Sequence, residues 1–252
     1  QPATGKNSLS FLFSLVFLQT ALSITPGILL YKNQDGSNWQ GAFLLILYLV
    51  VSNFSELAVR MQYRKDSRFP AAAYSIKLLL CSVLIILFAS QTQWQFALIL
   101  FGYELFQTVA NSRQYFYLDS FYYTLLNPLF KGFLLNMLFL MKAPIFFDPN
   151  QITALLPAFF VSIVLTLFQQ GQVSSRNRKP IFIACFLIGT LLFMGSILYL
   201  HLGKGYFSLW RVFAMVFASL MATIFTFRQK NFLKAETTLD LIYLLGLIFL
   251  YF

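Results

Sequence analysis

The chain has little charge and few cysteines. Asp, Glu, Lys and Arg make up only 10% of its 252 residues, whereas 59% are hydrophobic and 19% are aromatic, including 31 Phe. Soluble domains carry about 25% charged residues, so this composition excludes an ordinary soluble domain and indicates a protein that lies within a lipid bilayer. Cys81 and Cys185 each lie inside an apolar run. A free thiol behaves there as a small hydrophobic group, so we expect neither a disulfide nor a metal role.

The sequence also lacks the short motifs of soluble enzymes. It has no glycine-rich phosphate loop, no Cys/His metal motif, no G-x-S-x-G and no H-E-x-x-H, so no reaction can be predicted from a motif. The net charge of +10 does not indicate a nucleic-acid partner, because the basic residues lie in short segments between apolar runs. Anionic lipid headgroups or phosphorylated ligands are therefore the expected partners.

What the chain does have is long apolar runs. A helix needs about 20 residues to cross the hydrocarbon layer, and nine runs are close to this length. They are residues 9–31, 41–59, 74–90, 94–110, 121–143, 152–172, 180–200, 208–227 and 237–252. These runs are continuous rather than alternating, so they predict helices and not the strands of a barrel. We therefore predict an all-α membrane protein, with a bundle of about nine transmembrane helices forming one domain over residues 1–252.

The positions of the basic residues predict how the bundle is oriented. Most of them follow the second, fourth, sixth and eighth predicted helices, and Lys77 is assigned to the first of these loops. The opposite loops carry only Lys32, Lys142 and Lys204. Because Lys and Arg are concentrated in cytoplasmic loops, the amino terminus is predicted to be cytoplasmic and the carboxy terminus external, in the cell membrane.

Four predicted helices carry polar residues at helical spacing, toward their predicted cytoplasmic ends. The stripes are Asn53, Glu56 and Arg60; Glu104, Gln107 and Asn111; Asn127, Lys131 and Asn136; and Ser162, Thr166, Gln169 and Gln170. Polar groups are costly within a bilayer and are often functional there. We expect the stripes to line a cavity floored by Glu104 and Lys131. The alternative is that the uncharged residues join helices by hydrogen bonds and that Glu104 and Lys131 form a structural ion pair.

Two acids and the single histidine lie outside these stripes. Glu236 and Asp240 stand one turn apart at the start of the last predicted helix. Acids complement the positive end of a helix dipole, so we predict that both cap this helix. His201 is assigned to an external loop, and a metal site there is not expected because no second His or Cys lies nearby.

The predicted helix count, the cytoplasmic amino terminus and the basic loops after the second and sixth helices resemble the UbiA superfamily of membrane prenyltransferases. Asn53 is similar to the residue that opens the family's first motif. The segment from Asn127 to Lys131, with Asn136, is similar to its fifth helix. Gln169, running into the basic loop that ends at Lys179, looks like its sixth helix and second motif.

The family binds a prenyl diphosphate through Mg²⁺, which is held by two motifs of the form N-D-x-x-D-x-x-x-D and D-x-x-x-D. Both motifs are missing here: residues 53–60 contain one carboxylate, Glu56, and residues 169–176 contain none. Mg²⁺ is commonly bound through carboxylates together with substrate phosphates. We therefore expect Mg²⁺ only if a prenyl diphosphate is the substrate, and the cofactor is otherwise unknown.

The resemblance implies a protein that binds an isoprenoid or another anionic lipid in a cytoplasm-facing pocket and has degenerate catalysis. Glu56 and Lys131 are the candidate catalytic residues. The candidate ligand-binding residues are Asn53, Arg60, Arg64, Arg68, Glu104, Gln107, Asn127, Gln169, Gln172, Arg176, Arg178 and Lys179. Two alternatives stay open. One is an active prenyltransferase that moves a prenyl group to a lipophilic acceptor, and the other is a transporter or a subunit with a protein partner in the membrane.

Overall fold

The computed structural model describes residues 9–31, 39–63, 70–111, 120–140, 149–173, 179–229 and 231–252. These ranges fold into helices. Their bounds are α1 Leu9–Tyr31, α2 Trp39–Tyr63, α3 Ala71–Gln91, α4 Trp94–Asn111, α5 Phe121–Pro128, the π-helix η2 Leu129–Leu134, α6 Leu135–Leu140, α7 Pro149–Ala154, α8 Leu156–Val173, α9 Lys179–Lys204, α10 Leu209–Arg228 and α11 Phe232–Tyr251. The all-α prediction is confirmed.

Five helices in the described ranges are long and apolar enough to cross a membrane: α1, α2, α3, α9 and α10. The chain is therefore a multi-pass membrane protein. Each of the nine predicted runs overlaps one helix or a set of consecutive helices. That all nine runs cross the membrane, which membrane they cross and which end faces the cytoplasm stay predictions.

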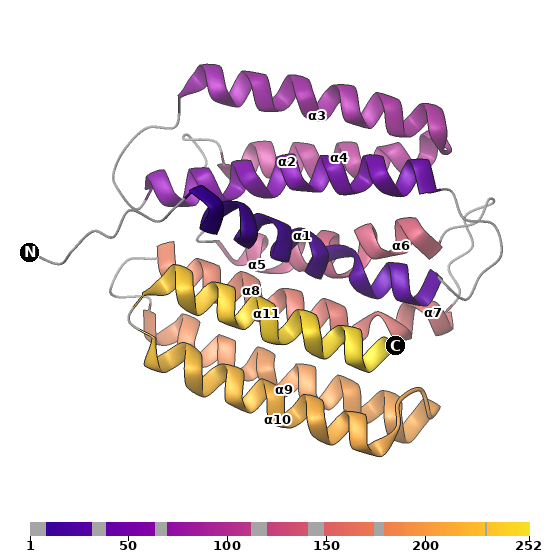
Figure 1. Ribbon diagram of the computed structural model, residues 1–252, viewed down its shortest axis with the longest axis vertical. Coiled ribbons are helices and arrows are strands. Elements are labelled where there is room, and N and C mark those ends of the chain that lie inside the picture. The colour runs from indigo at the N-terminus through magenta and orange to yellow at the C-terminus, as the bar shows by residue number, and fades with distance from the viewer. Residues whose placement is uncertain are drawn as a thin grey trace, which may run out of the picture.

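The helices lie side by side, and successive segments run in opposite directions (Figure 1). α2, α3 and α4 lie on one side of the bundle and α9 and α10 on the other, with α1, the α5–η2–α6 segment, α8 and α11 between them. We call the end where α1 and α11 begin, and where α2, α8 and α10 finish, the amino-terminal end of the bundle. Arg60, Arg228 and Lys234 lie in helical turns near this end.

Two residues that were predicted to lie in loops belong to helices. Lys77 lies inside α3, where its side chain is buried. His201 lies in the last turn of α9, and its Nδ1 is 2.6 Å from the Phe207 carbonyl oxygen. Lys77 lies within the predicted run 74–90 itself, so it was counted with the loop although it belongs to the helix, where it pairs with Glu104. His201 was misplaced because α9 continues to Lys204, past the end of the predicted run.

The fifth predicted helix is interrupted by a π-helical turn directly after Pro128. Proline has no backbone N–H, and a π turn changes the direction in which the following side chains point. Asn136 supports this turn, because its Nδ2 donates to the carbonyl oxygens of Lys131 at 3.0 Å and Gly132 at 3.3 Å. The turn places Lys131 on the inner side of the bundle, where its side chain is buried.

Gly132 lets this turn approach α8 closely. A Cβ atom on Gly132 would lie 2.6 Å from the Phe159 Cα and 2.8 Å from the Ala158 carbonyl oxygen. Both are backbone atoms, so only a shift of α8 would relieve the clash. We expect Gly132→Ala to destabilise the protein by about 1–3 kcal/mol, the usual effect of overpacking. Thermal unfolding of the detergent-solubilised protein measures this loss.

Gly195→Ala is the matched control for this prediction. A Cβ atom on Gly195 has no neighbour within 4 Å, and alanine favours a helix over glycine by about 0.5–1 kcal/mol. We expect this variant to unfold at or above the wild-type temperature. Equal unfolding temperatures for the two variants would contradict the close approach of η2 to α8.

Candidate functional site

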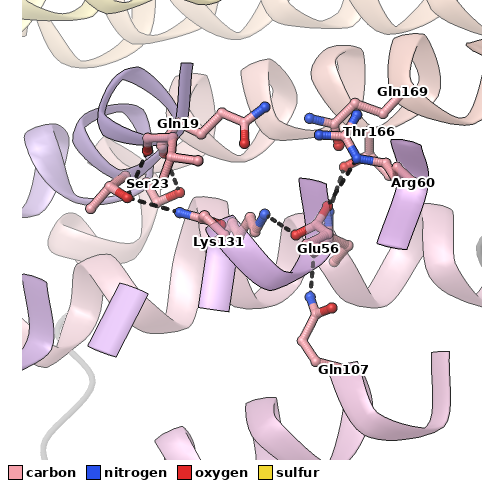
Figure 2. A network of polar contacts seen from close by, with 12 residues as sticks. Gln19, Ser23, Glu56, Arg60, Gln107, Lys131, Thr166 and Gln169 are labelled. Carbon is pink, nitrogen blue, oxygen red and sulfur yellow. Dashed lines mark hydrogen bonds and ion pairs between the residues drawn. The ribbon is translucent and has the colours of Figure 1, made fainter. Parts of the chain in front are cut away.

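The polar stripes predicted on four helices meet inside the bundle, in the half nearest its amino-terminal end. Figure 2 shows residues of α2, α4, η2 and α8 together with Gln19 and Ser23 of α1. The structure therefore brings the predicted stripes together, and it adds α1 and α11, which carry none of these stripes.

Glu56 is the counter-ion of Lys131. Lys131 Nζ donates to Glu56 Oε2 at 2.6 Å, and the Tyr123 hydroxyl donates to Glu56 Oε1 at 3.0 Å. Arg60 Nε lies 4.0 Å from Glu56 Oε1. The side chains of Glu56 and Lys131 are only 2% and 10% exposed. The two candidate catalytic residues thus form a buried ion pair.

The alternative in which Glu104 and Lys131 form an ion pair with each other is wrong, and Glu104 is not among the residues that line the cavity between the stripes. Glu104 pairs with Lys77 of α3 and also accepts a hydrogen bond from the Tyr48 hydroxyl at 3.1 Å. Helical spacing identified Glu104 as a polar residue on one face of its helix. It did not reveal that the partners of Glu104 are Lys77 of α3 and Tyr48 of α2 and not Lys131 of η2.

Glu236 of α11 accepts three hydrogen bonds on a single oxygen. Its Oε1 receives Gln19 Nε2 at 2.7 Å, Arg60 Nη1 at 2.9 Å and Gln169 Nε2 at 3.0 Å. Glu236 is 0% exposed. It therefore connects α11 to α1, α2 and α8.

The prediction that Glu236 and Asp240 cap the last helix is wrong. α11 begins five residues earlier than predicted, and its N-cap is Asn231, whose side chain accepts from the Leu233 N–H at 3.1 Å. A signal for burial was present in the sequence. Glu236 and Asp240 continue the spacing of Tyr243, which lies on the buried face of the helix.

The uncharged members of the stripes link neighbouring helices. Asn53 Nδ2 donates to Thr20 Oγ1 at 3.0 Å, which joins α2 to α1. Asn127 Nδ2 donates to Thr166 Oγ1 at 3.0 Å, and Gln107 Nε2 donates to Asn127 Oδ1 at 3.4 Å. These contacts join α4, α5 and α8, as the helix-joining alternative expects.

The network surrounds a small cavity of about 30 Å³. Its lining residues are Gln19, Leu22, Ser23, Asn127, Lys131, Val161, Ser162, Leu165, Thr166, Gln169 and Asp240. One water molecule needs about 10–15 Å³ by this kind of measure, whereas pockets for small-molecule ligands span about 300–1,000 Å³. The cavity has room for a water but not for a diphosphate.

The rest of the predicted ligand set has side chains that the structure does not describe. Arg64, Arg68, Arg176 and Arg178 lie outside the described residues. Gln172 lies in α8 and Lys179 begins α9, but their side chains are outside the described part of the chain. Their role in binding stays a prediction.

The carboxylates that the structure describes do not fit a Mg²⁺–diphosphate site. Across the described ranges, no group of three or more His, Cys, Asp or Glu residues could hold a metal ion. Glu56 and Glu236 already accept hydrogen bonds from Lys131 and Arg60. A metal ion would have to displace these basic groups.

Two larger grooves lie between helices away from this network. The α5–α9 groove, of about 390 Å³, is lined by Ser120, Phe121, Thr124, Leu125, Ile163, Leu167, Ile181, Phe182, Cys185, Ile188, Gly189 and Leu192. The α9–α10 groove, of about 380 Å³, is lined by Leu167, Phe168, Gly171, Phe182, Ile183, Phe186, Thr226, Phe227, Gln229 and Phe232. Both volumes lie within the range of ligand-binding pockets.

Comparison with protein-family models, with curated proteins and with solved structures gives no match to this chain. The resemblance to the UbiA superfamily therefore stays a prediction, and the function has to be inferred from the geometry of the chain itself.

Proposed function

We propose that this multi-pass membrane protein binds an isoprenoid or another lipid with an anionic headgroup in the α9–α10 groove. The observation that carries the proposal is an aromatic, lipid-sized groove beside exposed basic residues. Five phenylalanines line it: Phe168, Phe182, Phe186, Phe227 and Phe232. Such a lining suits an unsaturated or branched hydrocarbon chain, because aromatic side chains bury a large apolar area.

The charge at the amino-terminal end of the bundle suits an anionic headgroup. Arg228 stands between the groove residues Phe227 and Gln229, and Lys234 follows two residues after Phe232. Both basic side chains are exposed. Each Lys or Arg near an anionic lipid surface contributes about 1 kcal/mol of attraction. The predicted orientation places this end at the cytoplasmic leaflet, where anionic lipids are concentrated.

The central polar network has a structural role in this proposal. Its charged groups pair with one another around a cavity of about 30 Å³, so the hydrocarbon chain is assigned to the groove and not to the network. The proposed lipid binding is compatible with a UbiA-like membrane architecture. It involves no prenyl transfer, because the described carboxylates offer no Mg²⁺ site.

Photo-crosslinking tests the proposal. The full chain in nanodiscs is labelled with a photoreactive prenyl diphosphate, with and without a chelator. Ile183 lines the groove and is 44% exposed, so Ile183→Trp should fill it. We expect about tenfold weaker labelling, which corresponds to about 1.4 kcal/mol of lost binding free energy. The cross-link should map to α9 or α10.

Ile188→Trp is the matched control, because Ile188 lies on the same helix, is 56% exposed and lines only the α5–α9 groove. This variant should be labelled as strongly as the wild type. Arg228→Gln should weaken labelling by the diphosphate more than labelling by the matching prenyl alcohol. Equal labelling of the two tryptophan variants would overturn the assignment of the groove. Labelling that disappears with the chelator would point to a metal-dependent site instead.

A further inference from the structure

Asp240 is a buried acid that makes no ion pair and no hydrogen bond at normal distance within the described part of the chain. It is 0% exposed, and neither of its carboxylate oxygens has a hydrogen-bond partner among the described residues. Gln19 lines the same cavity, and one N–H of its side-chain amide donates to Glu236 at 2.7 Å, which leaves its second N–H as a neighbour of Asp240. An ionised carboxylate that is buried without hydrogen bonds is strongly destabilised, so such a group is usually neutralised.

The space beside Asp240 admits water and little else. Asp240 lines the cavity of about 30 Å³ together with Lys131 and Gln169. This volume exceeds the about 10–15 Å³ that one water needs, and the lining offers the polar partners that a buried water needs. A water in this cavity can therefore exchange a proton with the carboxyl group.

The charges around Asp240 do not balance. The charged or titratable groups of the network are Glu236 and Tyr243 on α11, Glu56 and Arg60 on α2, Lys131 on η2 and Tyr123 on α5. α1 and α8, which pack against α11, have no Asp, Glu, Lys or Arg within their described ranges, and α10 has Arg211 and Arg228 only near its ends.

Three carboxyl groups thus face two basic groups. With every group ionised, the network carries one surplus negative charge. A net charge within the buried interior of the bundle is costly, so the folded network favours the uptake of one positive charge.

A proton suits this site better than a metal ion. Lys131 lies in the same cavity wall as Asp240 and would repel a metal ion that stayed bound there, whereas a proton bound to Asp240 leaves a neutral carboxyl group. Asp240 is also the single carboxylate that lines the cavity, whereas a metal ion needs several oxygen ligands. A proton needs only one oxygen, and its binding to a carboxylate oxygen of Asp240 neutralises the surplus negative charge there.

We infer that Asp240, with the cavity beside it, is a proton-binding site within the interior of the bundle, a role that goes beyond lipid binding. Uptake forms an O–H bond at one carboxylate oxygen with a proton from a hydronium ion, which remains as the cavity water. Release returns the proton to that water.

Infrared difference spectroscopy of the full chain in nanodiscs tests this inference. The wild type should show the carbonyl band of a protonated carboxyl group at neutral pH, and the band should shift in D₂O. Asp240→Asn should abolish the band, and Asp240→Glu should restore it at a shifted frequency. Glu104→Gln, which alters an acid paired with Lys77, should leave it unchanged.

Three results would overturn the inference. They are a wild type without the band at neutral pH, a band that persists in Asp240→Asn, and a band that Na⁺ abolishes while the same concentration of choline does not. The last result would assign the cavity to a metal cation. If Asp240→Asn does not fold, the D₂O shift in the wild type and the Asp240→Glu frequency decide the question.

Discussion

Glu236→Ala is expected to destabilise the folded protein by about 3–5 kcal/mol, the usual loss when one partner of a buried ion pair is removed. The substitution leaves the Arg60 guanidinium buried without its nearest carboxylate, which lies at 2.9 Å. It also removes the acceptor for Gln19 and Gln169. Unfolding of the purified protein in mixed detergent micelles measures the loss of free energy.

Two further variants of α11 separate the causes of this loss. Glu236→Gln keeps an oxygen that can accept from Gln19 and Gln169 but removes the charge that pairs with Arg60, so its loss should be smaller. Thr238→Ala removes only a hydrogen bond to the Lys234 carbonyl oxygen at 2.9 Å within the same helix. Its effect should stay within about 0.5 kcal/mol. If Glu236→Ala is no less stable than Thr238→Ala, the network does not hold the bundle together.

The sequence predicts the helices well because their signal is local. A continuous apolar run of about 20 residues favours a helix wherever it lies in the bundle. The π turn after Pro128 was not predicted, since its stability depends on Asn136 reaching back to the carbonyl oxygens of Lys131 and Gly132. Such contacts are not visible in composition or hydropathy.

The sequence predicts which polar residues share a helix face, but it does not predict their partners on other helices. This difference has a physical reason. Spacing along one helix shows which polar residues share a face, so the stripes through Glu56, Gln107, Lys131 and Gln169 were found. Spacing does not show which helix packs against that face. The expected pairing of Glu104 with Lys131 is therefore not the observed one: Glu104 pairs with Lys77, and Lys131 pairs with Glu56.

Glu236 and Asp240 were misread for a different reason. Acids near the start of a helix fit a capping role, and the predicted start at residue 237 placed both acids there. Because α11 begins at Phe232, both acids lie inside the helix. Their common spacing with Tyr243 was the better guide to burial. An acid that continues the apolar stripe of a membrane helix is better read first as a buried partner.

Variants of the Glu56–Lys131 pair test whether the network is structural or is an active site. Lys131→Met leaves the Glu56 carboxylate buried with the Tyr123 hydroxyl and with Arg60 at 4.0 Å, so we expect a loss of about 3–5 kcal/mol. The double variant Glu56→Gln/Lys131→Met removes both charges together. It should recover most of that loss, because an uncharged pair leaves no unpaired ion in the interior.

The same variants give a second readout, lipid labelling in the α9–α10 groove. If the pair is structural, the double variant should unfold near the wild-type midpoint and should still be labelled by the photoreactive prenyl diphosphate. The coupling energy from the cycle should exceed about 1 kcal/mol, as contacting residues in one network usually show. Single and double variants that fold equally well but lose a prenyl-transfer activity of the wild type would argue instead that Glu56 and Lys131 act on a substrate. That result would make turnover the function of the central network.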